Sequence, residues 1–248
     1  MSECPNHCKN GIYIDPYTHK RRICEFCRDK RKEEIKNGDE KVKLRLPPSL
    51  CGTNFSPDNV IPASALPLLD EESVNSVKEA MNRLISGVVL CELPDESVLF
   101  NFGSRCHDAN FIAPFMRKAY EAGLSVAPLL TPTDIVQLRR TYNEGKEVDF
   151  SYDDVIHSQV CVIVLDAGTL SDEILYAKGL MQLRAYQKLP TIFVTHIWNV
   201  GLNSLCGDVG GKSYDLATLY SVKYVKSLEI EQGDSRRMTL DAFTKTFQ

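Results

Sequence analysis

The apolar and polar positions from residue 47 onward alternate between amphipathic stretches and short apolar runs. The amphipathic stretches predict helices at 70–86, 110–122, 132–142 and 171–188, and the apolar runs predict strands at 97–101, 125–130, 160–165 and 191–197. Asp70 and Ser171 are placed to cap two of the helices, and Thr131 or Thr133 a third. Strands that alternate with helices indicate an α/β fold with a largely parallel sheet covered by helices on both faces. In such sheets ligands bind at the carboxyl ends of the strands.

A change of composition near residue 46 predicts a domain boundary. Leu46-Pro47-Pro48 ends a charged segment, and the chain to about Ala65 is rich in Pro, Asn and Ser, which is typical of a surface crossing. We therefore expect a small module with a charged linker at residues 1–46 and the α/β domain at residues 47–248.

The net charge also changes sign at about residue 46. Residues 1–46 carry 12 Lys and Arg against 8 Asp and Glu, a net charge of +4, whereas the remaining residues carry a net charge of −8. An acidic partner or nucleic acid is therefore expected to contact the front end. A solvated helix of mixed charge within residues 29–43 explains the same charges equally well.

The nine cysteines and the apolar runs indicate the cellular setting. The longest apolar runs are about strand length, far short of the roughly 20 residues that a bilayer crossing needs. The first ten residues lack the features of a secretory signal, so we expect a cytoplasmic protein, in the host cytoplasm if it is phage-encoded. Cysteines there are thiols or metal ligands. Five occur singly, and most are expected to be buried apolar residues: Cys51, Cys91, Cys106, Cys161 and Cys206.

The other four cysteines form two closely spaced pairs. Cys4 and Cys8 lie in CPNHC, Cys24 and Cys27 lie in CEFC, and 15 residues separate the pairs. Each tight turn can direct two sulfurs at one point, as tetrahedral Zn²⁺ requires, and the intervening loop is long enough to fold back as a hairpin. A segment of about 30 residues buries too little apolar surface to fold alone, so metal binding would supply most of its folding free energy. The sequence therefore predicts a zinc-binding module.

The identity of one ligand stays open. Two residues separate His7 from Cys4, which is the usual ligand spacing, so His7 could replace Cys8, although the all-thiolate set is favoured. His19 in the loop is expected to be exposed. Four protein ligands leave no open position for water, which favours a structural zinc over a catalytic one.

The order of elements in the larger domain is that of a P-loop ATPase. A strand, a glycine-containing loop and a helix come first, and later apolar strands end in Asp166 and in Thr195-His196. Preceded by a cysteine-paired module, this layout resembles the DnaC/DnaI-type (IstB-like) replicative helicase loaders of the AAA+ superfamily, particularly phage-borne ones. Residues 190–198 resemble the family's sensor strand, and residues 233–237 resemble its Gly-x-x-x-Arg stretch. The resemblance implies an N-terminal region that grips the helicase and an AAA+-like domain that assembles and contacts single-stranded DNA.

The phosphate loop departs from this family. The family pattern is Gly-x4-Gly-Lys-Ser/Thr, in which backbone amides cradle the phosphates, Lys neutralises them and the hydroxyl holds Mg²⁺. This chain keeps Gly103, but Asp108 stands at the second Gly, Ala109 at the Lys and Asn110 at the Ser/Thr. Loss of the Lys forfeits charge-assisted hydrogen bonds worth about 1.5–3 kcal/mol each. The Asp108 carboxylate would also bring negative charge toward the phosphates.

Two further departures from the family pattern also indicate that ATP is not hydrolysed. Ala167 follows Asp166, so the second carboxylate that would orient the attacking water is missing. No arginine occurs between Gly201 and Ser235, although Arg236 and Arg237 could act as sensor residues. We therefore expect a pseudo-ATPase that has no catalytic residue and binds ATP weakly or not at all. Its degenerate nucleotide pocket would include Gly103, Arg105 and Asp166, and Arg105 or His107 could replace the missing Lys.

The resemblance implies a helicase loader or a helicase-binding adaptor in DNA replication, with the replicative helicase as partner and Zn²⁺ as structural cofactor. An active ATP-dependent loader with an unusual phosphate loop and a helicase inhibitor are the alternatives. The net charge of −8 over residues 47–248 predicts weak contact with single-stranded DNA. Arg139, Arg140 and Lys146 are the candidates for that contact, with a solvated surface as the competing role. Assembly into a homo-oligomer is left open.

Overall fold

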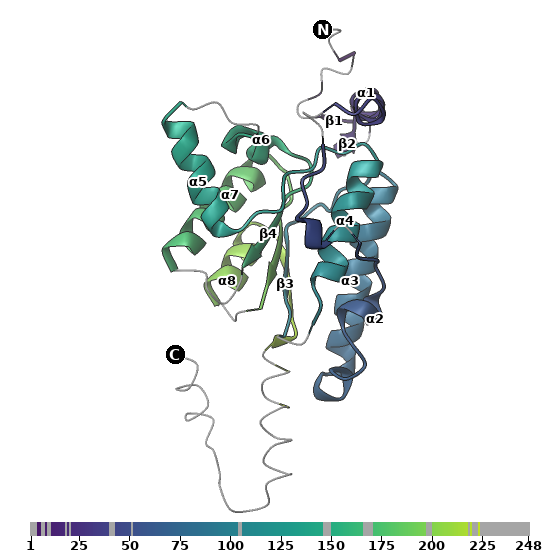
Figure 1. Ribbon diagram of the computed structural model, residues 1–248, viewed down its shortest axis with the longest axis vertical. Helices are drawn as coiled ribbons and strands as arrows, with labels where there is room; N and C mark the ends of the chain where they lie inside the picture. Colours follow the sequence, from purple (N-terminus) through teal and green to yellow (C-terminus); the bar gives the residue numbers. More distant parts are fainter. Residues whose placement is uncertain are drawn as a thin grey trace, which may run out of the picture.

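The molecule consists of a sheet between two layers of helices, with a small cysteine-containing module at one end of the sheet (Figure 1). The structure is a computed structural model that describes residues 4–5, 8, 11–17, 19, 21–39, 43–50, 52–103, 106–145, 150–165, 171–196, 200–217, 219 and 223. None of the described helices is both long enough and apolar enough to cross a membrane.

Within the described residues, four parallel strands form the sheet in the order β4-β5-β3-β6. The strands are β3 (Val98–Asn101), β4 (Val162–Leu165), β5 (Ile192–Thr195) and β6 (Lys212–Asp215). Asn101 is in register with Thr195 on one side and with Asp215 on the other. The carboxyl ends of three neighbouring strands therefore lie level at one edge of the sheet.

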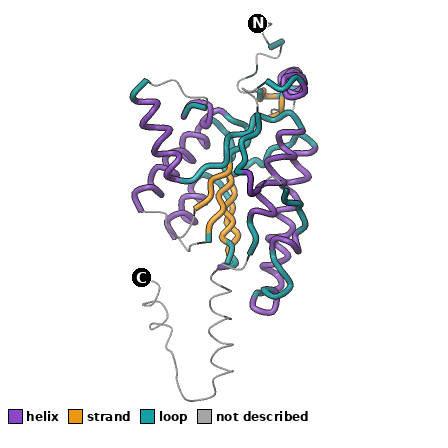
Figure 2. The backbone as a smooth tube through the Cα atoms, viewed as in Figure 1, coloured by secondary structure: helices purple, strands orange, loops and turns teal. Residues whose placement is uncertain are grey.

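Helices cover both faces of the sheet because side chains alternate along each strand (Figure 2). One face packs against α2 (Pro57–Val60), α3 (Glu71–Val89) and α4 (Ala109–Glu121). The other packs against α5 (Pro132–Asn143), α6 (Tyr152–His157), α7 (Ser171–Tyr186) and α8 (Val200–Asp208). In β3, Phe100 belongs to the first core and Leu99 to the second.

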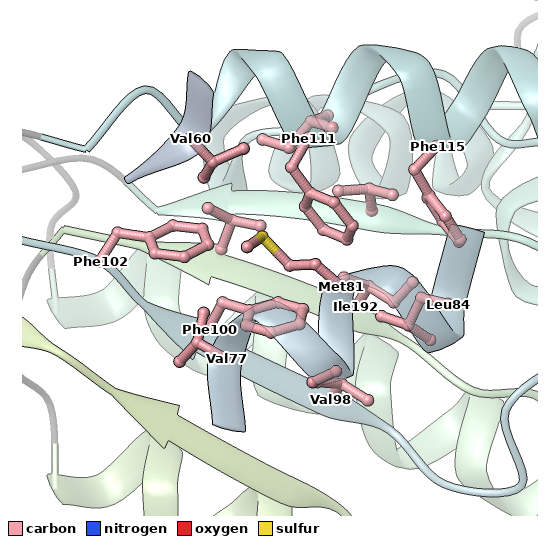
Figure 3. Close-up of a cluster of buried hydrophobic side chains, with 14 of the residues drawn as sticks. Val60, Val77, Met81, Leu84, Val98, Phe100, Phe102, Phe111, Phe115 and Ile192 are labelled. Carbon is pink, nitrogen blue, oxygen red and sulfur yellow. The ribbon is translucent and has the colours of Figure 1, made fainter. Parts of the chain in front are cut away.

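An aromatic cluster fixes the start of α4 against β3 (Figure 3). The rings of Phe100 and Phe111 meet edge to face with their centroids 5.3 Å apart, and Phe111 stacks on Phe115 at 5.7 Å. All three side chains are buried. Aromatic pairs of this kind add about 0.5–1.5 kcal/mol each beyond burial of their area. The first turn of α4 is thereby held beside the end of β3.

The N-terminal module is a hairpin followed by a helix. The strands β1 (Ile12–Ile14) and β2 (Arg21–Ile23) pair antiparallel, and α1 (Glu25–Lys36) follows directly. The hairpin expected between the two cysteine pairs is therefore present. Ile23 packs against the core on the α3–α4 face, which places the module on the larger domain.

The strongly patterned elements of the larger domain form close to where the sequence predicted them. Asp70 caps α3 by accepting a hydrogen bond from Ser73 N at 2.9 Å. Thr131, and not Thr133, caps α5 in a reciprocal capping box with Asp134. Ser171 is the first residue of α7.

Two predictions were wrong, one for a strand and one for a connecting segment. Residues 125–130 make isolated parallel bridges to the β4 region, because the amides of Ala127 and Leu130 that donate to Val160 O and Val162 O are three residues apart and not two as in a regular strand. The segment before α3 is not only a surface crossing. It contains η2 (Pro48–Leu50), α2 and η3 (Leu66–Leu68), and Val60 and Ile61 are fully buried. The sequence analysis also did not predict α6, α8 and β6.

A fully buried arginine connects α6, α7 and the start of β5. The Arg184 guanidinium donates hydrogen bonds to the carbonyls of Val155, Ser158 and Pro190 and to the Thr191 hydroxyl, the last at 3.0 Å. Burial lowers the pKa of Arg184. The hydrogen bonds offset the cost of removing this cation from water.

The substitution R184M should lower the free energy of unfolding by about 2–4 kcal/mol, because three buried carbonyls lose their donor. Urea denaturation monitored by circular dichroism measures the loss. R140M at an exposed position of α5 is the matched control and should change stability by less than about 0.5 kcal/mol. Equal midpoints for the two variants would contradict the structural role of Arg184.

Candidate functional site

Four thiols of the N-terminal module meet at one point. The Sγ atoms of Cys4, Cys8, Cys24 and Cys27 all lie within 4.8 Å of one another. The Cys8 sulfur lies 3.3 Å from that of Cys4 and 3.1 Å from that of Cys27, and the Cys4 and Cys24 sulfurs are 3.5 Å apart. Four sulfurs at about 2.3 Å from a central Zn²⁺ would be separated by about 3.8 Å. The cluster could therefore hold one tetrahedral metal ion, with Cys8 among the donors.

The local fold explains how the thiols converge. The hairpin brings Cys24 N to within 2.7 Å of Gly11 O, and Cys24 is the N-cap residue of α1, with Cys27 in its first turn. Desolvation raises the pKa values of Cys27 and Cys8, and the thiols of Cys4 and Cys24 raise them further. A divalent cation is what would stabilise four thiolates at such a place. His7 lies outside the described residues.

The module docks at the amino ends of the strands. The Gln159 side chain, just before β4, donates to Gly11 O at 3.2 Å and accepts from Ser125 N at 2.9 Å. On the other side α1 crosses the end of α4, where Gly123 has a φ of +84° and a Cβ atom would lie 2.8 Å from Arg28 O. Only glycine allows both this conformation and this approach. The thiol cluster therefore belongs to the amino edge of the sheet (Figure 1).

A second candidate site lies at the opposite, carboxyl edge. After β3 the chain enters α4 on one face of the sheet, and after the adjacent β5 it enters α8 on the other face. Neighbouring strands whose connections leave on opposite faces open a crevice, which is where α/β proteins bind ligands. We refer to this place, between Asp108 and His196, as the crevice.

An ion pair spans the crevice. The Nε2 atom of His196, just after β5, lies 3.2 Å from Oδ2 of Asp108, the residue before α4, and the two side chains are 26% and 20% exposed. Asp108 raises the pKa of His196 against the opposing effect of burial. The pairing therefore favours the imidazolium form and places one positive and one negative charge in the crevice.

Three polar atoms near this edge lack partners within the described part of the chain. They are Nδ2 and Oδ1 of Asn101 and Nδ1 of His196, all buried. Asn101 is the last residue of β3 and pairs with Thr195 of β5. Buried polar atoms are nearly always hydrogen-bonded, so these atoms mark a position where a further polar group would complete the bonding.

Three backbone amides at the connection between β3 and α4 already donate hydrogen bonds within the protein. Cys106 N donates to Gly103 O at 3.0 Å, His107 N donates to Val60 O at 2.8 Å, and Asn110 N donates to His107 O at 2.9 Å. A phosphate-binding loop needs such amides to point at its ligand. In this arrangement those three amides already have carbonyl acceptors.

Cys106 is the only thiol of the described residues in this loop. Burial, with a further contribution from the Asp108 charge, raises the pKa of Cys106 to about 11. The thiol therefore stays protonated at neutral pH and is a poor nucleophile.

The structure describes only part of the predicted nucleotide pocket. Gly103 lies in the loop after β3, whereas Arg105 and Asp166 fall outside the described residues. Lys146, Arg236 and Arg237 also fall outside them. The contact between Asp108 and His196 was missed by sequence reasoning, which treated Asp108 only as a charge that opposes phosphate. The available signal was an acid at the start of one helix and a histidine at the end of a neighbouring strand.

The sequence matches no protein-family model and no curated protein. Among solved structures, that of DnaI is similar over 72% of this chain and 96% of its own, with 11% identity and a TM-score of 0.44. The DnaC helicase loader covers 60% of this chain and 92% of its own, with 17% identity and a TM-score of 0.39. The replication initiator DnaA bound to AMPPCP and single-stranded DNA covers 79% and 59%, with 15% identity and a TM-score of 0.42. Likenesses this distant do not establish a shared function.

The thiol cluster predicts a metal-dependent module. The purified chain should contain one zinc ion, and C24S should lose it, because three thiolates do not complete the tetrahedron. C91S is the control, since Cys91 lies outside the cluster. Elemental analysis by mass spectrometry measures the metal content. Full zinc occupancy in C24S, or equal loss in C91S, would contradict this assignment.

The ion pair predicts a pH-dependent contribution to stability. The pKa of His196 is raised in the folded state, so the stabilisation is complete below the unfolded value of about 6.5 and is lost as pH rises through the folded pKa. D108N removes this component. The stability gap between the wild type and D108N in urea denaturation should therefore shrink from about pH 5.5 to 8.5. A constant gap would show that the charged pair contributes nothing.

Proposed function

We propose that this chain is a loader or adaptor that binds the replicative helicase and functions without hydrolysing ATP. The observation that carries this proposal is the ion pair between Asp108 and His196, in the crevice where an α/β ATPase places phosphates. The choice of helicase as partner rests on the resemblance of the element order and cysteine pairs to the DnaC/DnaI-type loaders.

The charges in the crevice oppose nucleotide binding. His196 is already paired with Asp108, so these two side chains together offer a phosphate no net positive charge. Ala109 replaces the lysine that would donate to the phosphates, and two such bonds are worth about 3–6 kcal/mol. A loss of this size weakens binding by more than about 100-fold. We therefore infer that ATP does not drive this protein.

The zinc module is our candidate for the helicase-binding surface. It exposes three large apolar side chains: Tyr17 is 92% exposed, Ile14 52% and Phe26 38%. Exposed aromatic and aliphatic side chains are typical anchors of protein interfaces. The module lies at the edge of the sheet opposite to the crevice (Figure 1). A partner can therefore bind the module when the crevice contains no nucleotide.

DNA contact is expected to contribute little. The Arg139 guanidinium lies 5.5 Å from the ring centroid of Tyr176 on the α5–α7 surface. A cation beside an aromatic ring suits a stacked base. The net charge of the larger domain is negative, which opposes strong non-specific binding.

Capture by the cognate replicative helicase tests the proposal. Y17A should weaken capture by at least about 10-fold, because truncation of an interface aromatic typically costs more than 1 kcal/mol. Y186A is the matched control, since Tyr186 on α7 is also highly exposed, at 86%. Biolayer interferometry with immobilised helicase measures both affinities. No binding by the wild type, or equal effects of the two variants, would refute the proposed surface.

An ATP hydrolysis assay separates a pseudo-ATPase from an active ATPase with an unusual loop. The wild type should show no turnover above background, with or without helicase, because Ala109 stands where the family pattern has the lysine that holds the phosphates. Turnover above background that disappears in D108N would favour the active ATPase. Adding the protein to helicase and to DNA coated with single-strand-binding protein separates loading from inhibition.

A further inference from the structure

The Asp108 side chain does not do what an aspartate at a helix N-terminus ordinarily does. Asp108 is the N-cap residue of α4, yet its side chain accepts no capping hydrogen bond from the amides of that helix. An N-cap aspartate normally accepts from the second or third amide of the helix. Here the carboxylate instead reaches across the crevice to His196 at the end of β5.

The position of the carboxylate is one that favours an anion. The N-terminus of α4 carries a partial positive charge from the helix dipole, and the loop from β3 delivers the chain to that point. Strand–loop–helix arrangements of this kind bind phosphate because dipole and amides both face the anion. In this chain an anion is already present, covalently attached to the loop itself.

Contacts from α2 fix the same loop on its other side. His107 N donates to Val60 O at 2.8 Å, and the Asn110 side chain donates to Asn59 O at 2.9 Å. Val60 is fully buried in the core beside α3 and α4. The loop is thus held between α2 and β5, with the carboxylate of Asp108 directed to β5.

We propose that the Asp108 carboxylate takes the place of a bound phosphate. It acts as a tethered anion that joins the N-terminus of α4 to the end of β5, so the two elements hold one arrangement without a nucleotide. This inference rests on the proposed loss of nucleotide use, but it adds a structural role for the residue that replaced the loop glycine. His196 is then a positioning residue that contacts the tethered anion.

Removal of the Asp108 carboxylate tests the proposal. D108A should leave His196 without its anion at the start of α4, and a free anion of the same class should then occupy the vacated position. Sodium pyrophosphate is the probe, and sodium chloride at equal ionic strength is its control. Full-length wild type, D108A and D153A are compared by differential scanning fluorimetry. Asp153 pairs with His157 at 3.3 Å on the surface of α6 and supplies a matched Asp–His control.

The melting temperature of D108A should fall by roughly 2–4 °C and should recover by at least half with about 10 mM pyrophosphate. The wild type and D153A should show no such gain. The double variant D108A/H196A should show no recovery, because the cationic partner is gone. D108N replaces D108A in the same comparison if D108A fails to fold.

Three results would overturn the proposal: no loss of melting temperature in D108A, a loss that pyrophosphate does not reverse, or an equal gain in the wild type. The first two leave the absence of ATP hydrolysis untouched, so they would remove only the role of Asp108 as a phosphate substitute. An equal gain in the wild type, accompanied by ATP turnover, would remove the proposed function as well.

Discussion

The charge balance of one crevice is the constraint on which this structure depends. Because β3 and β5 are neighbours and send the chain to opposite faces of the sheet, their carboxyl ends cannot be covered by a single connecting helix. The N-terminus of α4 faces this place and favours negative charge there. A nucleotide-binding protein supplies that charge as phosphate. We propose that this chain supplies it as Asp108, which pairs with His196.

The two candidate sites occupy opposite edges of the same sheet. The thiol cluster is tied to the amino edge through Gly11 and Gln159 and through the close approach of α1 to Gly123. The crevice lies at the carboxyl edge. In our proposal, substitutions in the phosphate loop can therefore remove nucleotide chemistry without changing the surface of the N-terminal module that binds a partner.

The sequence predicted the elements whose patterns are strong and local. The apolar runs of β4 and β5 and the amphipathic pattern of α3 and α4 are read directly because burial determines them. The convergence of Cys4, Cys8, Cys24 and Cys27 was also predictable, since spacing alone brings each pair together. Edge strand β6 was missed because its KSYD sequence is half exposed and has no apolar run.

The contact between Asp108 and His196 could not be read from the chain. It joins residues far apart in sequence, and it depends on β3 and β5 being neighbours, which the order of elements does not state. The same limit applies to Arg184, whose burial follows from the meeting of α6, α7 and the start of β5. Polar residues of this kind have no periodicity that marks them as buried. Their roles appear only when the topology is known.

The affinity of the wild-type protein for Mg²⁺-ATP tests the central claim most directly. Isothermal titration calorimetry of the zinc-loaded chain should show no saturable heat at nucleotide concentrations up to about 1 mM, since the crevice already contains its own anion. Saturable binding of one nucleotide per wild-type chain at micromolar concentration, abolished by a larger side chain at Gly103, would contradict the account.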